Sequence, residues 1–88
     1  MKVRIQELGP RESYGQTIDY ARFETEDGHL VGVSRYGGKP WCIDSLFMPN
    51  GLPVYVHGVG SRCCAKSVLT EGIAAQLDAA VAKPPTLN

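Results

Sequence analysis

Hydrophobic and polar residues alternate with a period of two along the first half of the chain. Val3 and Ile5 alternate with charged or polar neighbours over residues 2–8, which predicts a half-buried strand ending at Gly9-Pro10. Residues 9–16 contain two glycines, a proline and polar side chains, which predicts a surface loop. Later runs, rich in β-branched and aromatic side chains, also predict strands. They cover residues 17–25, 30–36, 41–43 and 54–57. The pattern therefore predicts a small sheet of four or five strands.

Turn residues between these runs set the expected register. Asp27-Gly28 and Gly37-Gly38 each separate two runs, and such pairs favour two-residue type I′ hairpins because glycine readily adopts φ > 0. Two-residue loops would place Tyr20 directly opposite Arg35. The expected core face then carries Ala21, Phe23, Leu30, Gly32, Ser34, Trp41 and Ile43. The opposite face carries Ile18, Tyr20, Arg22, Glu24, Val31, Val33, Arg35, Cys42 and Asp44.

From Ser61 onward the apolar spacing changes to three and four residues, which is typical of a helix. One helix over residues 62–82 is favoured, with Ser61 as N-cap, over two helices that meet near Thr70. Pro84-Pro85 should end it. The sequence predicts an α+β fold, with an antiparallel meander and one C-terminal helix packed on one face. Residues 1–83 are expected to form a single domain and residues 84–88 a tail.

Composition limits the possible functions. Nine basic residues balance nine acidic residues, so no global field favours nucleic acid or an anionic membrane. No apolar run is long enough to cross a bilayer, and the N-terminal alternation does not resemble a signal peptide. Three cysteines are an odd number for a disulfide framework. We therefore expect a cytoplasmic protein without a membrane partner.

The segment from His57 to Arg62 is a candidate anion site. Its strand, glycines and helix start could present free backbone N–H groups, so Gly58, Gly60, Ser61 and Arg62 could hold a phosphate. The segment matches neither the Walker loop nor the dinucleotide fingerprint. A sharp bend from strand to helix is the favoured interpretation.

The cysteines suggest two further kinds of chemistry. A metal site would have to combine His29 or His57 with cysteines that lack the usual ligand spacing, so we predict no metal and no cofactor. Cys63 or Cys64 near a helix start could be a nucleophile, which makes a small thiol enzyme an alternative. We favour one buried and one partly exposed thiol without a catalytic role, and no catalytic residue is assigned.

The sheet face away from the helix is the favoured binding surface. Tyr20, Arg22, Arg35 and Val33, with Tyr14 at a loop tip, combine residue types that protein interfaces favour. The sequence resembles no family by motif. Its size and layout are analogous to those of phage-encoded inhibitors of host defence, such as anti-CRISPR proteins. We predict a non-enzymatic protein-binding module, with homodimerisation as another use of this face, and nucleic-acid or nucleotide-phosphate binding as a less favoured alternative.

Overall fold

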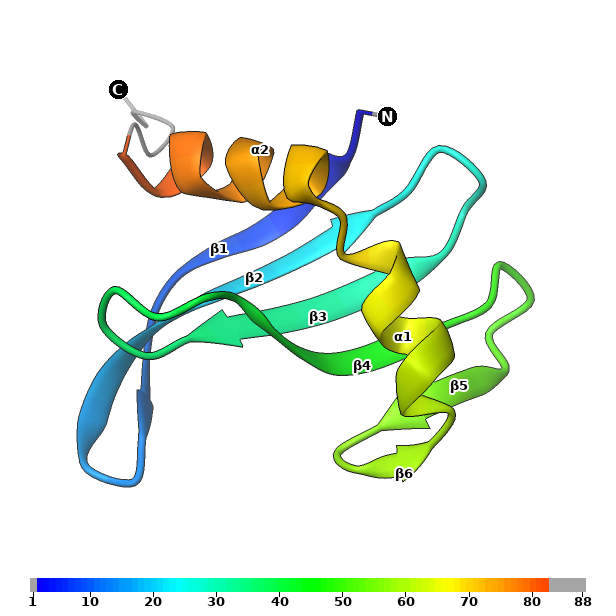
Figure 1. Ribbon diagram of the computed structural model, residues 1–88, viewed down its shortest axis with the longest axis horizontal. Helices are drawn as coiled ribbons and strands as arrows, with labels where there is room; N and C mark the ends of the chain where they lie inside the picture. Colours follow the sequence, from blue (N-terminus) through cyan, green and yellow to red (C-terminus); the bar gives the residue numbers. More distant parts are fainter. Residues whose placement is uncertain (1, 83–88) are drawn as a thin grey trace.

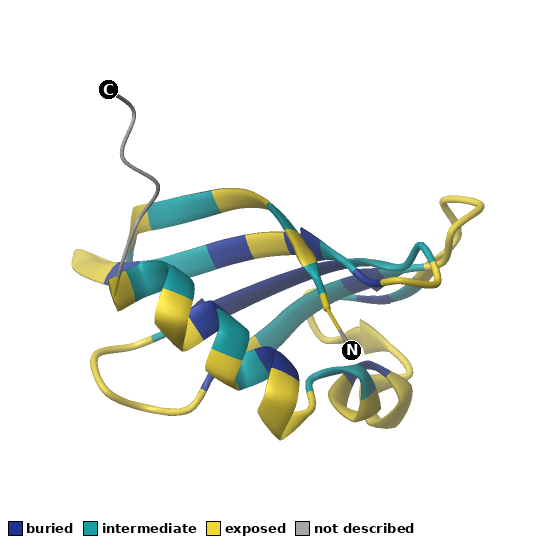
Figure 2. Ribbon diagram, turned by 90° about the horizontal axis from the view of Figure 1, so that it is seen from above, coloured by how far each residue is buried: buried dark blue, intermediate teal, exposed yellow. Residues whose placement is uncertain are grey.

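The computed structural model describes residues 2–82 and shows one antiparallel sheet with two helices on the same face (Figures 1 and 2). The strands lie side by side in sequence order. They are β1 (Arg4–Ser13), β2 (Gln16–Glu24), β3 (Leu30–Arg35), β4 (Cys42–Phe47), β5 (Pro53–Val56) and β6 (Val59–Gly60). The helices are α1 (Arg62–Val68) and α2 (Glu71–Ala82). The predicted α+β class and antiparallel meander are confirmed, whereas the predicted tail at 84–88 lies outside the described residues.

The first strand is longer than predicted. β1 continues through Gly9 and Pro10, where the sequence predicted a loop, and pairs with β2 as far as Ser13 opposite Gln16. Proline is tolerated there because β1 is an edge strand, where a missing backbone N–H need not remove a ladder hydrogen bond. Tyr14 and Gly15 then close the hairpin with φ values of 49° and 76°, as a type I′ turn requires.

The register between β2 and β3 differs by one residue from the prediction. The backbone N–H of Thr25 donates to the carbonyl of His29, so Glu26, Asp27 and Gly28 form a three-residue loop. Tyr20 therefore pairs with Ser34, and Asp19 pairs with Arg35. Because side chains alternate between faces, this slip reverses the expected orientation of all of β3.

The core therefore contains a different set of β3 side chains from the one expected. Val31 and Val33 are buried on the helix side, whereas Gly32 and Ser34 share the other face with Arg22 and Tyr20. A bulge between β3 and β4 still places Ile43 opposite Val33, so Ile43 lies on the core face as predicted. The buried cluster comprises Ala21, Phe23, Val31, Val33, Trp41, Leu46, Tyr55, Ala65, Ile73 and Leu77.

The C-terminal apolar stripe forms two helices, so the favoured single helix is wrong. The chain breaks at Leu69 and Thr70, and the backbone N–H of Ile73 donates to Thr70 Oγ1 at 3.3 Å. Thr70 thus acts as the N-cap of α2, as the alternative prediction required, while Ser61 caps α1. The break lets α1 pack on β4 and β5 while α2 lies across β1 (Figure 1). Neither helix in residues 2–82 is long and apolar enough to span a membrane.

Candidate functional site

The predicted binding patch is divided between the two faces of the sheet. Tyr20 and Arg22 lie on the face without helices, hereafter the open face, because their neighbours Ala21 and Phe23 point into the core. Val33 is fully buried, and Arg35 lies on the helix side. The prediction that Tyr20 and Arg35 face each other is therefore wrong. The difference arises because the loop after β2 has three residues, not two, which shifts the register of β3 by one residue.

Arg35 connects the sheet to α2. Its Nε and Nη2 atoms donate to Asp19 Oδ2 at 3.2 and 3.0 Å, and its Nη1 atom donates to Asp78 on α2. The guanidinium carbon also lies 4.6 Å from the ring centroid of Trp41, whose indole N–H donates to Asp78 at 2.8 Å. Only 19% of the Arg35 side chain is exposed. These contacts assign Arg35 a structural role in place of the predicted binding role.

The open face is organised around Tyr20. The guanidinium carbon of Arg11 lies 3.7 Å from the centroid of the Tyr20 ring, and Arg11 also pairs with Glu7 at 3.1 Å. A Cβ atom built on Gly32 would lie 2.7 Å from Ser45 Oγ and 3.9 Å from Tyr20 Oη. The tyrosine therefore reaches over small residues in the middle of the sheet. Sequence reasoning missed Arg11 because it assigned residues 9–16 to a loop.

Tyr14 and Arg22 are the exposed members of the predicted patch. Tyr14 is 98% exposed at the tip of the β1–β2 hairpin, which projects beyond the rest of the sheet (Figure 1). Ser13 Oγ and Tyr36 Oη lie 3.3 Å apart and support the base of this tip. Arg22 is exposed and forms no ion pair among residues 2–82. An aromatic ring and an unpaired guanidinium are thus available to a partner.

The glycine segment forms a hairpin before the helix begins. His57 and Gly58 have φ values of 46° and 89°, which close a type I′ turn between β5 and β6. A Cβ atom on Gly60 would lie 2.2 Å from the carbonyl oxygen of Val54, so this close approach requires glycine. Ser61 Oγ accepts a hydrogen bond from the backbone N–H of Cys64. These features explain Gly58, Gly60 and Ser61 structurally, while Arg62 lines a separate cavity.

All three cysteines are exposed and free of disulfide bonds. The expectation that one of the adjacent pair is buried is wrong, because Ala65 supplies the buried position of α1 instead. Cys42 Sγ lies 3.8 Å from the carbonyl oxygen of Pro40. Across residues 2–82, no histidine or carboxylate hydrogen-bonds a thiol, and no group of three potential ligands could hold a metal. The thiol-enzyme alternative therefore has no positioned base within the described chain.

The loop between β2 and β3 contains a polar network that sequence reasoning missed. The Thr25 hydroxyl donates to the Asp27 carboxylate, and His29 Nδ1 lies 3.0 Å from Asp27 Oδ1. The Thr25 hydroxyl, followed by His29, lowers the pKa of Asp27. Thr25 Oγ1 also accepts from the backbone N–H of His29 at 3.0 Å. This network closes the three-residue loop that sets the register.

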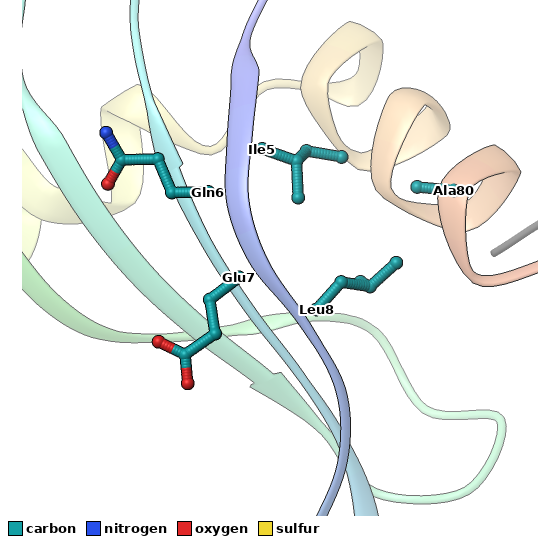
Figure 3. Close-up of a pocket in the computed structure, with 5 residues that line it drawn as sticks. All are labelled: Ile5, Gln6, Glu7, Leu8 and Ala80. Atoms are coloured by element: carbon teal, nitrogen blue, oxygen red, sulfur yellow. The ribbon is translucent and has the colours of Figure 1, made fainter. Parts of the chain in front are cut away.

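A groove of about 500 Å³ separates the edge strand β1 from α2. Ile5 and Leu8 extend towards Ala80, while Gln6 and Glu7 point away from it (Figure 3). Among the described lining residues, apolar side chains face the groove, and no polar groups converge on it to orient a specific ligand.

Comparison of the chain with family models, curated proteins and solved structures finds no match. The open face and the cavities of residues 2–82 are therefore the candidate binding surfaces. Among residues 2–82, the open face with its projecting hairpin has the most exposed aromatic side chain and an arginine without an ion pair.

Proposed function

We propose that this chain is a small, non-enzymatic protein-binding module that acts by occupying a partner surface. The binding surface, hereafter the hairpin surface, consists of Tyr14, Arg11, Tyr20 and Arg22. The observation that carries the proposal is Tyr14, whose side chain is 98% exposed on a tight turn at the end of a projecting hairpin. Leaving a tyrosine fully hydrated contributes nothing to the core, whereas tyrosine and arginine are frequent anchors of protein interfaces.

The shape of the hairpin supports binding with little loss of conformational freedom. The turn at Tyr14-Gly15 is two residues long, and β1 and β2 pair through to its base. Arg11 is held over the Tyr20 ring before any partner arrives. Because Arg11 and Tyr20 already contact each other, these two side chains require little further ordering on association. The module suits a role as an inhibitor that covers a functional surface of a host defence complex, as anti-CRISPR proteins do.

Capture of a partner from host lysate by the immobilised chain tests this function. We expect Tyr14→Ser combined with Arg22→Ala to abolish capture of the species that the unmodified chain retains. Both side chains are exposed, and neither forms an ion pair among residues 2–82. The double variant should therefore unfold at nearly the same temperature as the unmodified chain.

Lys39→Ala is the matched control, because Lys39 is also exposed and lies outside the hairpin surface. Unchanged capture by the folded double variant would exclude the hairpin surface. Retention of only the chain itself, with concentration-dependent self-association, would indicate homodimerisation. Capture that disappears steeply with salt and after nuclease treatment would favour the nucleic-acid alternative.

A further inference from the structure

A second cavity lies on the helix side of the sheet, where β4 begins beneath α1. Its volume is about 370 Å³, which is within the range of small-molecule sites. It is lined by Trp41, Cys42, Ile43, Arg62, Lys66 and Leu69. This cavity, hereafter the tryptophan cavity, is on the opposite side of the sheet from Tyr20 and Arg22.

The inner wall of the tryptophan cavity is apolar. Trp41 is only 8% exposed, and Ile43 and Leu69 are half-buried against the same core. The indole N–H of Trp41 already donates to Asp78, so the ring presents carbon atoms and not a donor. A ligand in this cavity would therefore gain most from burying an apolar group.

The remaining lining is cationic. Arg62 and Lys66 are one helical turn apart on α1, so their side chains share one face of the helix. Both are exposed, and neither forms an ion pair among residues 2–82. The described residues that line the cavity include no carboxylate. The two charges are available to an anion from outside the chain.

The charge of Arg62 is placed unfavourably for the helix itself, whereas Lys66 lies in the last turn of α1, where a positive charge is favourable. Like charges one turn apart repel each other. Arg62 is also the first residue of α1, whose first turn contains no acidic side chain, so its charge opposes the helix dipole. No partner among the described residues compensates for this arrangement. Departures from local preference of this kind are characteristic of functional sites.

We propose that the tryptophan cavity binds a small amphiphilic carboxylate. Its carboxylate pairs with Arg62 and Lys66, and its short apolar chain lies against Trp41 and Leu69. A planar guanidinium matches a carboxylate with two parallel hydrogen bonds, and the lysine ammonium adds a second charge-assisted contact. This proposal is independent of the hairpin surface and of any protein partner.

Trp41 is the single tryptophan of the chain, so its fluorescence reports on this cavity directly. We expect hexanoate to change the emission saturably. Hexanamide, hexylamine and inorganic phosphate should bind at least about tenfold more weakly, because each lacks the negative charge or the apolar chain. Equal binding of hexanamide would show that the cations play no part, and equal binding of phosphate would show a generic anion site. Either result, or the absence of a hexanoate response, would overturn the proposal.

Substitution of the two cations tests the assignment of residues. Arg62→Gln with Lys66→Gln should weaken hexanoate binding by about tenfold or more, whereas Lys39→Gln should leave it unchanged. Undiminished affinity in the folded double variant would show that Arg62 and Lys66 do not hold the carboxylate.

Discussion

Arg22 and Arg35 show at the scale of single residues how register assigns roles. Arg22 lies on β2 and Arg35 on the neighbouring strand β3, and the sequence pattern predicted that they share one face of the sheet. Arg22 extends from the open face, whereas Arg35 is 19% exposed and contacts Asp19, Asp78 and Trp41. The same residue type thus serves as a free surface cation in one case and as a connection between sheet and helix in the other.

Alanine substitution at these two positions should have different effects on stability. Arg35→Ala leaves two carboxylates without their partner and removes the contact over Trp41, so we expect a loss of about 2 kcal/mol in the free energy of unfolding. Arg22→Ala should change it by less than about 0.5 kcal/mol. Chemical denaturation measures both values. Equal effects would contradict the observed register.

Asp27 should make part of the stability depend on pH. Its pKa is lowered from the ordinary value of 3.8 by the Thr25 hydroxyl and by His29, so the folded state favours the carboxylate form. This contribution is present above the unfolded pKa and is lost as pH falls through the lower folded pKa. Wild type should therefore exceed Asp27→Asn in stability near about pH 7, and the difference should shrink near about pH 2.

Urea denaturation at several pH values measures this difference. Thr25→Val keeps the side-chain shape but removes the largest cause of the shift, so it should reduce the same pH-dependent contribution. A difference between wild type and Asp27→Asn that stays constant across this range would contradict the assignment.

At the scale of elements, the hydrophobic pattern predicted which segments form strands but not every boundary or register. Runs of β-branched and aromatic residues were sufficient to locate β2 and β3, although β3 is buried on both faces. Loop length after β2 depends on hydrogen bonds among Thr25, Asp27 and His29, which the hydrophobic pattern does not contain. The continuation of β1 through Pro10 depends on its edge position, which is a property of the assembled sheet.

The break between α1 and α2 could not be located by periodicity alone. Apolar residues keep a helical spacing on both sides of Thr70, so one helix and two helices give the same stripe. Capping decides between them, because Thr70 Oγ1 accepts from Ile73 and the Thr70 carbonyl accepts from the N–H of Ala74. For the candidate site, the sequence predicted the exposure of Tyr14 and Arg22. It did not predict the loop length after β2, which changes the register by one residue and places Val33 and Arg35 on the helix side.

Two substitutions near this break should change stability in opposite directions. Thr70→Ala removes the cap of α2 and should lower the free energy of unfolding by about 1 kcal/mol. Gly72→Ala should raise it by about 0.5 kcal/mol, because a Cβ atom there meets only Thr70 Oγ1 at 3.9 Å and the unfolded chain loses freedom. Thermal and chemical denaturation provide the comparison. A Thr70→Ala variant as stable as wild type would show that the cap does not hold the break.

At the scale of the whole molecule, the helices cover one face of the sheet and leave the other open (Figure 2). The covered face holds the core and the tryptophan cavity, while the open face carries Tyr20 and Arg22. The β1–β2 hairpin extends this open face beyond the sheet and ends in Tyr14. Binding on one face therefore need not disturb the packing on the other.

Photo-cross-linking from the hairpin tip tests protein binding through this surface most directly. A benzophenone amino acid would replace Tyr14 in one variant and Leu52 in another; Leu52 is 59% exposed in the loop between β4 and β5, at the other end of the strands. After irradiation in host lysate, position 14 should yield one dominant adduct, which excess unmodified chain suppresses, and position 52 should not yield it. Equal adducts from both positions, or none from position 14 while the chain still captures its partner, would contradict binding through the hairpin surface.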